Sequence, residues 1–448
     1  MRLTKTLAAT AAAALILAGC GAGGRDNGGT DAGGDEPSAA EIVDGDTTGV
    51  TDTSIKLGTH QPLTGVAAPG YSEINTGMTA YFNFVNANGG VNGREIELIV
   101  KDDVYNPTNT TRVVEELVMQ DEVFAILGGL GTPTHTAVID YLTEEGVPDL
   151  FVSSGSSTWS EDPETHPNMY GWQIDYISEG KIMGQWIAEN YPDAKVGLYL
   201  QDDDLGEDGE EGLRQFIDDQ IVEVVKYTPG NTDVAPQITR LQASGADFVV
   251  GFNVPAYTAL SQLVAMRLNY QPQWMYSKIG ADINTVGGLL QQFSEGAVGE
   301  AGALEDVYTF QYMYGLDSGD SPWVDLWTRV WEEHGTGQPA TDYRGYGMAV
   351  AYTFVQALEA LGDNVTREGI IQVVQEQGST WEGPNLTPYH YSPDSHFGMS
   401  GGRVTQFKSG KAEPVGEIMV TTPDDGEVRL DDSGFADNVP PESGIPGQ

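Results

Sequence analysis

From Ile55 onward, short β-rich apolar runs alternate with segments whose apolar residues recur three and four residues apart. The second spacing places those residues on one stripe of a helix. Regular alternation of strands and helices is typical of parallel sheets covered by helices on both faces, so we predict an α/β fold. We expect strands at 55–58, 96–101, 124–127, 150–152, 196–200, 222–227 and 247–251, and helices at 71–88, 110–120, 180–190 and 346–361.

A length of 448 residues exceeds what one hydrophobic core usually holds, so we expect two lobes, each built on a doubly wound sheet. The N-terminal stretch "MRLTKTLAATAAAALILAGC" has a basic start, an apolar middle and small residues before Cys20. It predicts a signal peptide over 1–19, because the apolar part is too short for a permanent span. The ending is similar to the lipobox of bacterial lipoproteins, which implies that Cys20 is lipidated; an incidental cysteine is the alternative.

Residues 20–50 are rich in glycine and aspartate and predict a flexible tether after the lipidated cysteine. We therefore expect an extracytoplasmic protein that is anchored by lipid to the outer face of the cell membrane. Cys20 is the only cysteine, which excludes a disulfide within the chain.

The chain is strongly acidic, with 21 Lys+Arg against 66 Asp+Glu and a formal net charge of −45. Such a field repels nucleic acids and anionic lipid headgroups, so we expect no nucleic-acid partner and no membrane contact beyond the anchor. The acidity could reflect adaptation to a saline habitat, or the surface could be acidic for no such reason. Both interpretations remain open.

Two expected loops carry neutral hydrogen-bond donors. The first, 128–131, follows an apolar strand and precedes Thr132, which we expect to cap a helix whose first residue is Pro133. The N–H groups of Thr134 and His135 would then point outward, while the next loop, 153–158, presents serine and threonine hydroxyls. Because ligands bind beyond the carboxyl ends of parallel strands, the loops could hold a carboxylate together. Ordinary capped turns, with His135 only a cap, are the alternative.

Motifs for catalysis, cofactors and metals are missing. The sequence has no nucleophile elbow, dinucleotide fingerprint, phosphate loop or His-Glu-x-x-His pair. The acidic run 202–211 fails as a calcium loop, because Glu207 stands where glycine is required, and we interpret it as a solvated loop. We expect no enzyme, no cofactor and no metal.

Several stretches occur in the order of one known family: "IKLGTHQPLTG", "NFVNANGGVNGREIELIV", "ILGGLGTPTHTA" and "GVPDLFVSSGSS". From about Ile55 to Lys411 the chain resembles the leucine/isoleucine/valine-binding family of ABC-transporter solute-binding proteins, which have the type I periplasmic binding protein fold. The resemblance implies two lobes joined by a three-strand hinge that close on a ligand. It implies lobe 1 at 51–173 plus 304–377, lobe 2 at 174–303 plus 378–412, and an acidic tail at 413–448.

By position, the resemblance implies that Thr132 and Ser157 donate hydroxyls to a ligand carboxylate, that the Ser156 backbone meets the ligand and that Tyr71 covers it. Near the expected acid for an ammonium group stands Lys278, which would repel that group, with Asp282 four residues on. Leu205 stands where tyrosine is common. Asn253, Tyr257 and Trp172 could line the cleft or belong to the core.

The function implied is capture of a small carboxylate ligand, with a branched-chain or other amino acid foremost, for an ABC permease and its ATPase. We expect a monomer. A sensory role for the same lobes, or binding of aromatic or aliphatic acids or amides instead of amino acids, remains open.

Overall fold

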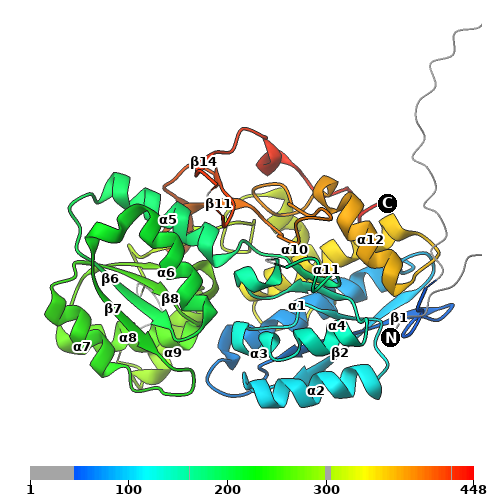
Figure 1. Ribbon diagram of the computed structural model, residues 1–448, viewed down its shortest axis with the longest axis horizontal. Coiled ribbons are helices and arrows are strands. Elements are labelled where there is room, and N and C mark those ends of the chain that lie inside the picture. Colours follow the sequence, from blue (N-terminus) through cyan, green and yellow to red (C-terminus); the bar gives the residue numbers. More distant parts are fainter. Residues whose placement is uncertain (1–44, 161, 298–303, 425) are drawn as a thin grey trace, which may run out of the picture. The chain divides into compact units, whose positions relative to one another are not determined.

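The fold is built on two β-sheets, and Figure 1 labels some strands of each. The computed structural model describes residues 45–160, 162–297, 304–424 and 426–448, which belong to one compact unit. The predicted signal peptide, Cys20 and most of the predicted tether lie outside these residues. No helix within the described ranges is both long and apolar enough to cross a membrane.

The first sheet has five strands in the order β2-β1-β3-β4-β5, and all of its pairs are parallel. Its central strands are completely buried, as expected for a sheet covered on both faces. The strands are β1 (Ser54–Gln61), β2 (Glu95–Asp102), β3 (Ala125–Leu127), β4 (Asp149–Val152) and β5 (Met169–Gly171), and their helices are α1 (Ala68–Ala87), α2 (Pro107–Met119), α3 (Thr132–Thr136) and α4 (Ile139–Glu144).

The second sheet has nine strands, and its core, β10-β9-β8-β6-β7, is parallel. These strands are β6 (Val196–Gln201), β7 (Ile221–Tyr227), β8 (Phe248–Phe252), β9 (Gln273–Tyr276) and β10 (Tyr308–Gln311). Antiparallel strands extend one edge: β11 (Gly401–Lys408), β12 (Lys411–Pro414), β13 (Met419–Val420) and β14 (Arg429–Leu430). The associated helices are α5 (Tyr176–Asn190), α6 (Asp204–Ile217), α7 (Ala235–Ser244), α8 (Pro255–Leu268) and α9 (Ile283–Phe293).

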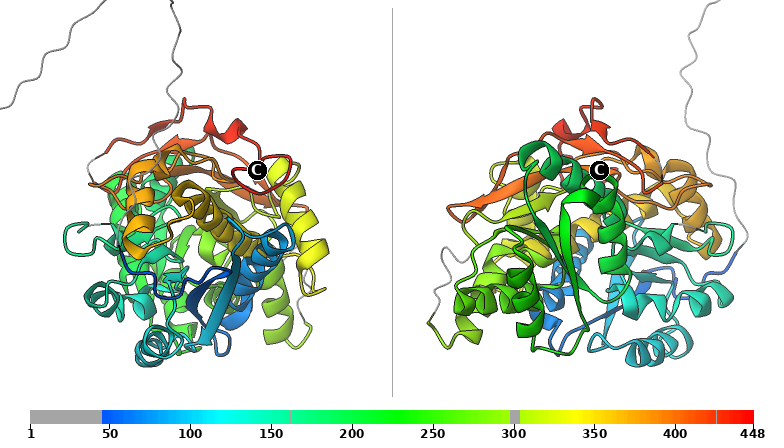
Figure 2. Two further views of the ribbon diagram at one scale, coloured as in Figure 1. Left: turned by 90° about the vertical axis from the view of Figure 1, so that its right-hand side faces the viewer. Right: turned by 60° about the vertical axis from the view of Figure 1, so that its left-hand side comes forward.

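Three later helices return to the first lobe. They are α10 (Pro322–His334), α11 (Asp342–Leu361) and α12 (Arg367–Gln377). Both α10 and α11 pack on α1, although they follow the second sheet in sequence, and Figure 2 shows them beside the first lobe. The chain then rejoins the second sheet through β11, so it passes between the lobes three times. The predicted two-lobe α/β fold is confirmed. The crossing segments carry isolated bridges such as Met313 to Asn385 instead of one named sheet.

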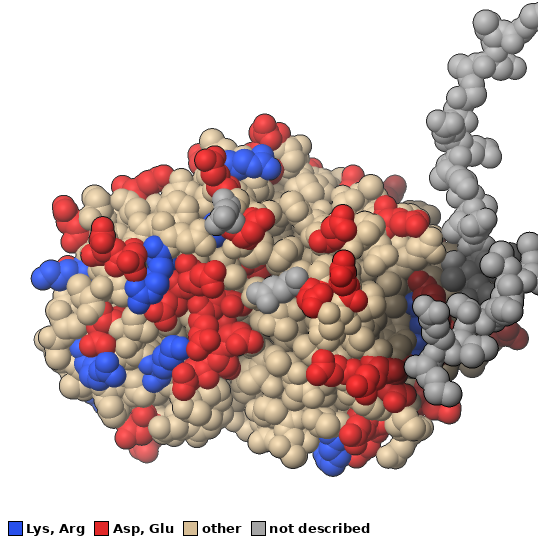
Figure 3. Space-filling model, in the orientation of Figure 1, with Lys and Arg blue, Asp and Glu red and all other residues tan. Residues whose placement is uncertain are grey.

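Local signals explain several helix starts. Asn106 caps α2 through the N–H groups of Thr108 and Asn109, and Pro107 begins the helix. Residues 204–211 are helical, which corrects the predicted acidic loop: Asp203 caps α6, and acidic residues in its first turn suit the positive end of the helix dipole. Figure 3 shows acidic side chains gathered over this part of the surface.

Residues after β12 pack against the body. The Tyr81 hydroxyl donates to the Gly444 carbonyl at 2.8 Å, and the Trp323 indole N–H donates to the Asn438 carbonyl at 3.1 Å. Nearby, the Lys181 ammonium on α5 donates to the carbonyl oxygens of residues 422, 424 and 426 at 2.8, 2.7 and 2.6 Å. These contacts join the C-terminal segment to both lobes.

Candidate functional site: a tyrosine-walled pocket between the sheets

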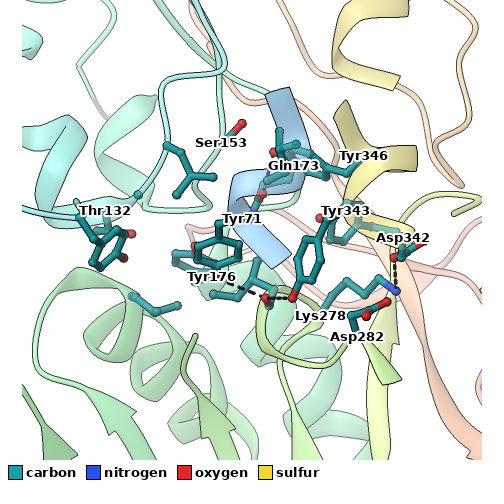
Figure 4. A pocket seen from close by; sticks show the side chains of 17 residues that line it. Tyr71, Thr132, Ser153, Gln173, Tyr176, Lys278, Asp282, Asp342, Tyr343 and Tyr346 are labelled. Atoms are coloured by element: carbon teal, nitrogen blue, oxygen red, sulfur yellow. Dashed lines mark hydrogen bonds and ion pairs between the residues drawn. The ribbon is translucent and has the colours of Figure 1, made fainter. Parts of the chain in front are cut away.

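A cavity of about 40 Å³ lies between loops from the two lobes. The first sheet contributes the loops after β3 and β4, and the second contributes the segments after β6 and β9. Ligands of open parallel sheets bind at such strand ends. Figure 4 shows Thr132 on one side of the cavity, Lys278, Asp282 and Asp342 on the other, and tyrosine rings between them.

The first lobe offers uncharged donors to the pocket. The Thr132 hydroxyl lies 2.7 Å from that of Ser154, and Ser153 at the end of β4 also lines the cavity. Tyr346 donates its hydroxyl to the side-chain oxygen of Gln173 at 3.0 Å, which fixes the orientation of that amide. The buried Gln173 Nε2 then has no hydrogen-bond partner among the described residues, so it can donate to a ligand.

The wall of the pocket is largely aromatic. Tyr71 on α1 and Tyr343 on α11 both donate to the backbone oxygen of Ile279, at 3.2 and 2.8 Å, and their rings meet edge to face. Burial raises the pKa of both phenols well above its usual range, so both stay protonated as donors. Tyr176 completes this part of the wall, and burial raises its pKa to about 12.

The side of the pocket opposite Thr132 carries more carboxyl groups than cations. The Lys278 ammonium lies 2.8 Å from an oxygen of Asp317 and 2.7 Å from one of Asp342. Burial alone would lower the pKa of Lys278, but the two carboxylates raise it above its usual range. Asp282 caps α9 with Oδ1 at 2.6 Å from the Thr285 nitrogen, and its buried Oδ2 has no partner among the described residues. Two carboxylates contact the ammonium, and Asp282 adds a third carboxyl group to this side of the pocket.

Burial also favours the protonated form of the carboxyl groups on this side of the pocket. It raises the pKa of Asp342 to about 7, with a further contribution from Asp317, and raises that of Asp282. Behind Lys278, the buried Glu179 accepts hydrogen bonds from the Ser277 hydroxyl and the Lys278 backbone N–H, both at 2.9 Å. Burial raises the pKa of Glu179 to about 7. A cation that enters here would favour the ionised carboxylates.

Of the residues expected from sequence, the structure brings Tyr71, Thr132, Lys278 and Asp282 together in the pocket, beside Leu205. Thr132 begins α3 but does not cap it: Gly131 precedes the helix at φ 101°, and the Thr132 hydroxyl turns to Ser154.

The other expected loop residues lie outside the pocket lining. Ser156 accepts the N–H of Thr158 at 3.3 Å, and the Ser157 N–H donates to a carboxylate oxygen of Asp208 at 2.8 Å. Thr134 donates to the Leu130 carbonyl at 2.5 Å, and His135 Nε2 lies 2.7 Å from an oxygen of Asp149. These groups have partners within the protein, so they support the loops instead of facing the cavity.

In the second lobe, Asn253 bonds to Thr258, and the Tyr257 ring stacks on Tyr227 at 3.9 Å between centroids. Both residues are fully buried and do not line the cavity, and neither does Trp172, whose indole donates to Thr353 at 3.0 Å. For these three, the structure agrees with the core alternative.

Sequence reasoning missed Ser153, Gln173, Asp342, Tyr343 and Tyr346 as lining residues. Ser153 directly follows β4 and Gln173 lies two residues after β5, and a position at a strand end is a usable signal. The last three come from the first turns of α11, which reaches the pocket only because that helix packs back on α1.

The comparisons with known proteins agree with this architecture. Residues 54–412 match the periplasmic binding protein family. A curated relative, the "Amino acid binding protein" of Pseudomonas aeruginosa, is 25% identical over 198 residues, which is 44% of this chain; the match spans about half of the relative's length, 52%.

Solved structures of similar fold include a fatty acid ABC transporter substrate-binding protein from Thermomonospora curvata, at 21% identity and a TM-score of 0.72, covering 86% of this chain and 97% of that one. Another is a branched chain amino acid ABC transporter protein from Thermus thermophilus with bound valine, at 20% identity and a TM-score of 0.71, covering 84% and 98%. With a family match over most of its length, the chain belongs to the periplasmic binding proteins of type I fold, similar to the leucine/isoleucine/valine-binding proteins.

Proposed function

We propose that the chain is the extracytoplasmic solute-binding lipoprotein of an ABC importer, and that it captures a small amino acid. The observation that carries this proposal is the polarity of the pocket. Thr132, Ser153 and Gln173 from the first lobe offer uncharged donors, and Asp282 and Asp342 supply carboxyl groups on the side opposite Thr132. A zwitterion matches both sets of groups, since the donors suit its carboxylate and the aspartates suit its ammonium group.

Lys278 does not oppose this assignment. Its ammonium is already shared between Asp317 and Asp342, so the charge that a ligand meets is that of the whole cluster. With all carboxylates ionised, three negative charges stand against one positive charge, which attracts a cation. The tyrosines and Leu130 that line the pocket suit an apolar side chain.

Capture would use closure of the lobes. The cavity of about 40 Å³ has room for only a few water molecules, so a ligand enters when the lobes separate. Contacts such as Ser157 to Asp208 and Tyr71 to Ile279 exist only when the lobes are together. A ligand that touches both lobes shifts the population toward the closed form by its difference in affinity for the two forms. The closed surface would then engage a permease, and a separate ATPase would supply energy.

Ligand chemistry is the point to test. A thermal-shift series should compare L-leucine and L-valine with leucinamide, which lacks the carboxylate, and with 4-methylpentanoate, which lacks the ammonium group. We expect stabilisation by the amino acids alone, because a ligand adds RT ln(1 + [L]/Kd) to native stability. An equal shift with 4-methylpentanoate would instead indicate a binder of aliphatic acids, the chemistry named for the Thermomonospora curvata protein.

Anchoring needs its own test. When the full chain is expressed in a bacterium that lipidates proteins, the wild type should fractionate with the membrane, and Cys20→Ser should be released into the soluble extracytoplasmic fraction. Equal distribution of the two would contradict the lipoprotein proposal and leave the ligand proposal untouched.

A further inference from the structure

Four buried titratable side chains form a continuous chain under the loop that leads to Thr132. His60 Nδ1 lies 2.9 Å from Asp103 Oδ2, and His60 Nε2 lies 2.9 Å from His135 Nδ1. His135 Nε2 lies 2.7 Å from Asp149 Oδ2. None of the four side chains has appreciable exposed surface, and the pocket described above does not include them.

The three contacts require three protons. Each joins two electronegative atoms at hydrogen-bond distance, so each needs one hydrogen between its atoms. Two ionised carboxylates and two neutral imidazoles supply only two hydrogens. One contact would then bring two lone pairs together in a site without water, and the chain would hold a charge of −2.

We propose that this chain, Asp103-His60-His135-Asp149, is a binding site for one additional proton, so that three protons fill its three contacts at pH 7. The net charge of the four groups is then −1. The proton is shared, and its midpoint belongs to the chain as a whole and not to one residue.

The surroundings indicate where the added proton lies. Burial lowers the pKa of His60, although Asp103 opposes the effect. His60 is therefore the neutral imidazole, which donates from Nδ1 to Asp103 and accepts at Nε2, and the added proton belongs to the His135–Asp149 half. Among the described residues, the groups that contact the chain from outside are uncharged: the Thr110 hydroxyl, 3.3 Å from Asp103 Oδ2, the Tyr105 backbone N–H at 2.8 Å from its Oδ1, and the Trp159 ring against His135.

The chain forms the floor of the loop that carries the ligand donors. A Cβ added to Gly129 would lie 2.5 Å from His135 Nδ1 and 2.7 Å from His60 Nε2, so the loop backbone rests directly on the two imidazoles. The Leu130 N–H donates to the His60 carbonyl at 3.1 Å, and the His135 N–H donates to the Gly131 carbonyl at 3.0 Å. The proton between the rings thus holds β1 to α3, and His60 and His135 act as positioning residues for Thr132.

Nitrogen-15 NMR of histidine-labelled protein tests the proton count without any ligand. At pH 7 we expect three slowly exchanging imidazole N–H protons on His60 and His135 together, assigned with His60→Asn and His135→Asn. In Asp149→Asn the new amide can donate to His135 Nε2, so the same contacts form with two imidazole protons. Two protons in the wild type, counting imidazole N–H groups together with any carboxylic acid proton on Asp149 or Asp103, would overturn the proposal.

Chemical unfolding from pH 7 to pH 9.5 gives an independent reading. The folded chain binds a proton that unfolded histidines, with a pKa of about 6.5, have released, so its stabilisation is lost as pH rises through the folded midpoint. Relative to Asp149→Asn, the folding constant of the wild type should fall by up to about tenfold per pH unit between about pH 6.5 and that midpoint, and should level off above it. If the unfolding free energies of the wild type and Asp149→Asn changed with pH in the same way, the proposal would be contradicted.

Matched variants serve as controls for the pH dependence of unfolding. Asp140→Asn alters an exposed aspartate 3.8 Å from His166 and should follow the wild-type curve. If Asp149→Asn does not fold, Asp103→Asn serves equally, since its amide can donate to His60 Nδ1. Because neither measurement uses a ligand, its failure is separate from a failure of the transport proposal.

Discussion

The ammonium group of Lys278 lies 2.7 Å from Oδ2 of Asp342 and joins the segment after β9 to the start of α11. The same ammonium lies 2.8 Å from Asp317, so removing it leaves two buried carboxylates without their cation. We expect Lys278→Met to lower the free energy of unfolding by about 3–5 kcal/mol, measured by urea denaturation.

The surface pair of Lys408 and Asp306 provides the matched control, because both side chains are well exposed. Lys408→Met should change the free energy of unfolding by less than about 1 kcal/mol. If both variants were equally stable, Lys278 would not be the counter-ion that its contacts indicate.

The raised pKa of Asp208 predicts that closure of the two lobes depends on pH. Burial raises its pKa to about 7 in the closed form, although the Ser157 N–H opposes the effect; Asp175 and Asp204 add to the rise. With the lobes apart, Asp208 would titrate nearer its usual value of about 3.9. The closed form therefore binds more protons, so this group strengthens ligand binding as pH falls from 7 toward 4, by less than about tenfold per pH unit.

Calorimetric titration with L-leucine at several pH values, on the wild type and on Asp208→Asn, isolates that contribution. The asparagine can still accept the Ser157 N–H but does not titrate. Its affinity should vary less with pH than that of the wild type, whose other buried acids, such as Glu179, remain in both proteins. A larger dependence in the variant would contradict the assigned sign.

Thr132→Val tests the uncharged donors of the pocket. The substitution keeps the shape of the side chain and removes the hydroxyl that faces the cavity and Ser154. Loss of one hydrogen bond to a charged ligand group is worth about 1.5–3 kcal/mol, so L-leucine should bind roughly tenfold to a hundredfold more weakly. Thr136→Val, on the same helix but outside the cavity lining, should bind nearly as the wild type does.

Gly129→Ala tests the close approach between the ligand loop and the two histidines. The added methyl group would lie within 2.7 Å of ring atoms of both His60 and His135, and overpacking of this kind costs about 1–3 kcal/mol. We expect that loss of unfolding free energy and weaker ligand binding in the same variant.

Gly288→Ala is the matched control for Gly129→Ala. Gly288 lies inside α9, and an added Cβ meets nothing within 4 Å. Alanine should stabilise this helix by about 0.5–1 kcal/mol. A neutral Gly129→Ala would mean that the loop moves aside easily and that the imidazoles do not fix it.

The architecture could be predicted because its signals are local. Each expected strand coincides with an observed one, as 55–58 does with β1, and the helices follow from stripes such as that of Ile74, Met78, Tyr81 and Val85 on α1. The acidic run at the start of α6 was misassigned, because its charge suggested solvent. Asp203 as cap and the glycines that let α5 approach α6 make it a packed helix.

The candidate site was harder to predict because its decisive pairs are distant in sequence. Near Lys278 the chain suggested repulsion of an ammonium group, and only Asp317 and Asp342, which arrive with later segments, reverse the sign of that charge. Similarly, the sequence around His135 is compatible with a helix cap or a ligand contact. Nothing local indicates that His60 and Asp149, on different strands, would enclose it.

The Lys181 ammonium donates to three carbonyl oxygens of one segment, so a cation that belongs to the chain neutralises their combined dipoles. Because this cation is covalently attached, it cannot be diluted, chelated or exchanged. Residues 422, 424 and 426 should therefore keep these contacts with α5 in dilute buffer and in concentrated brine alike.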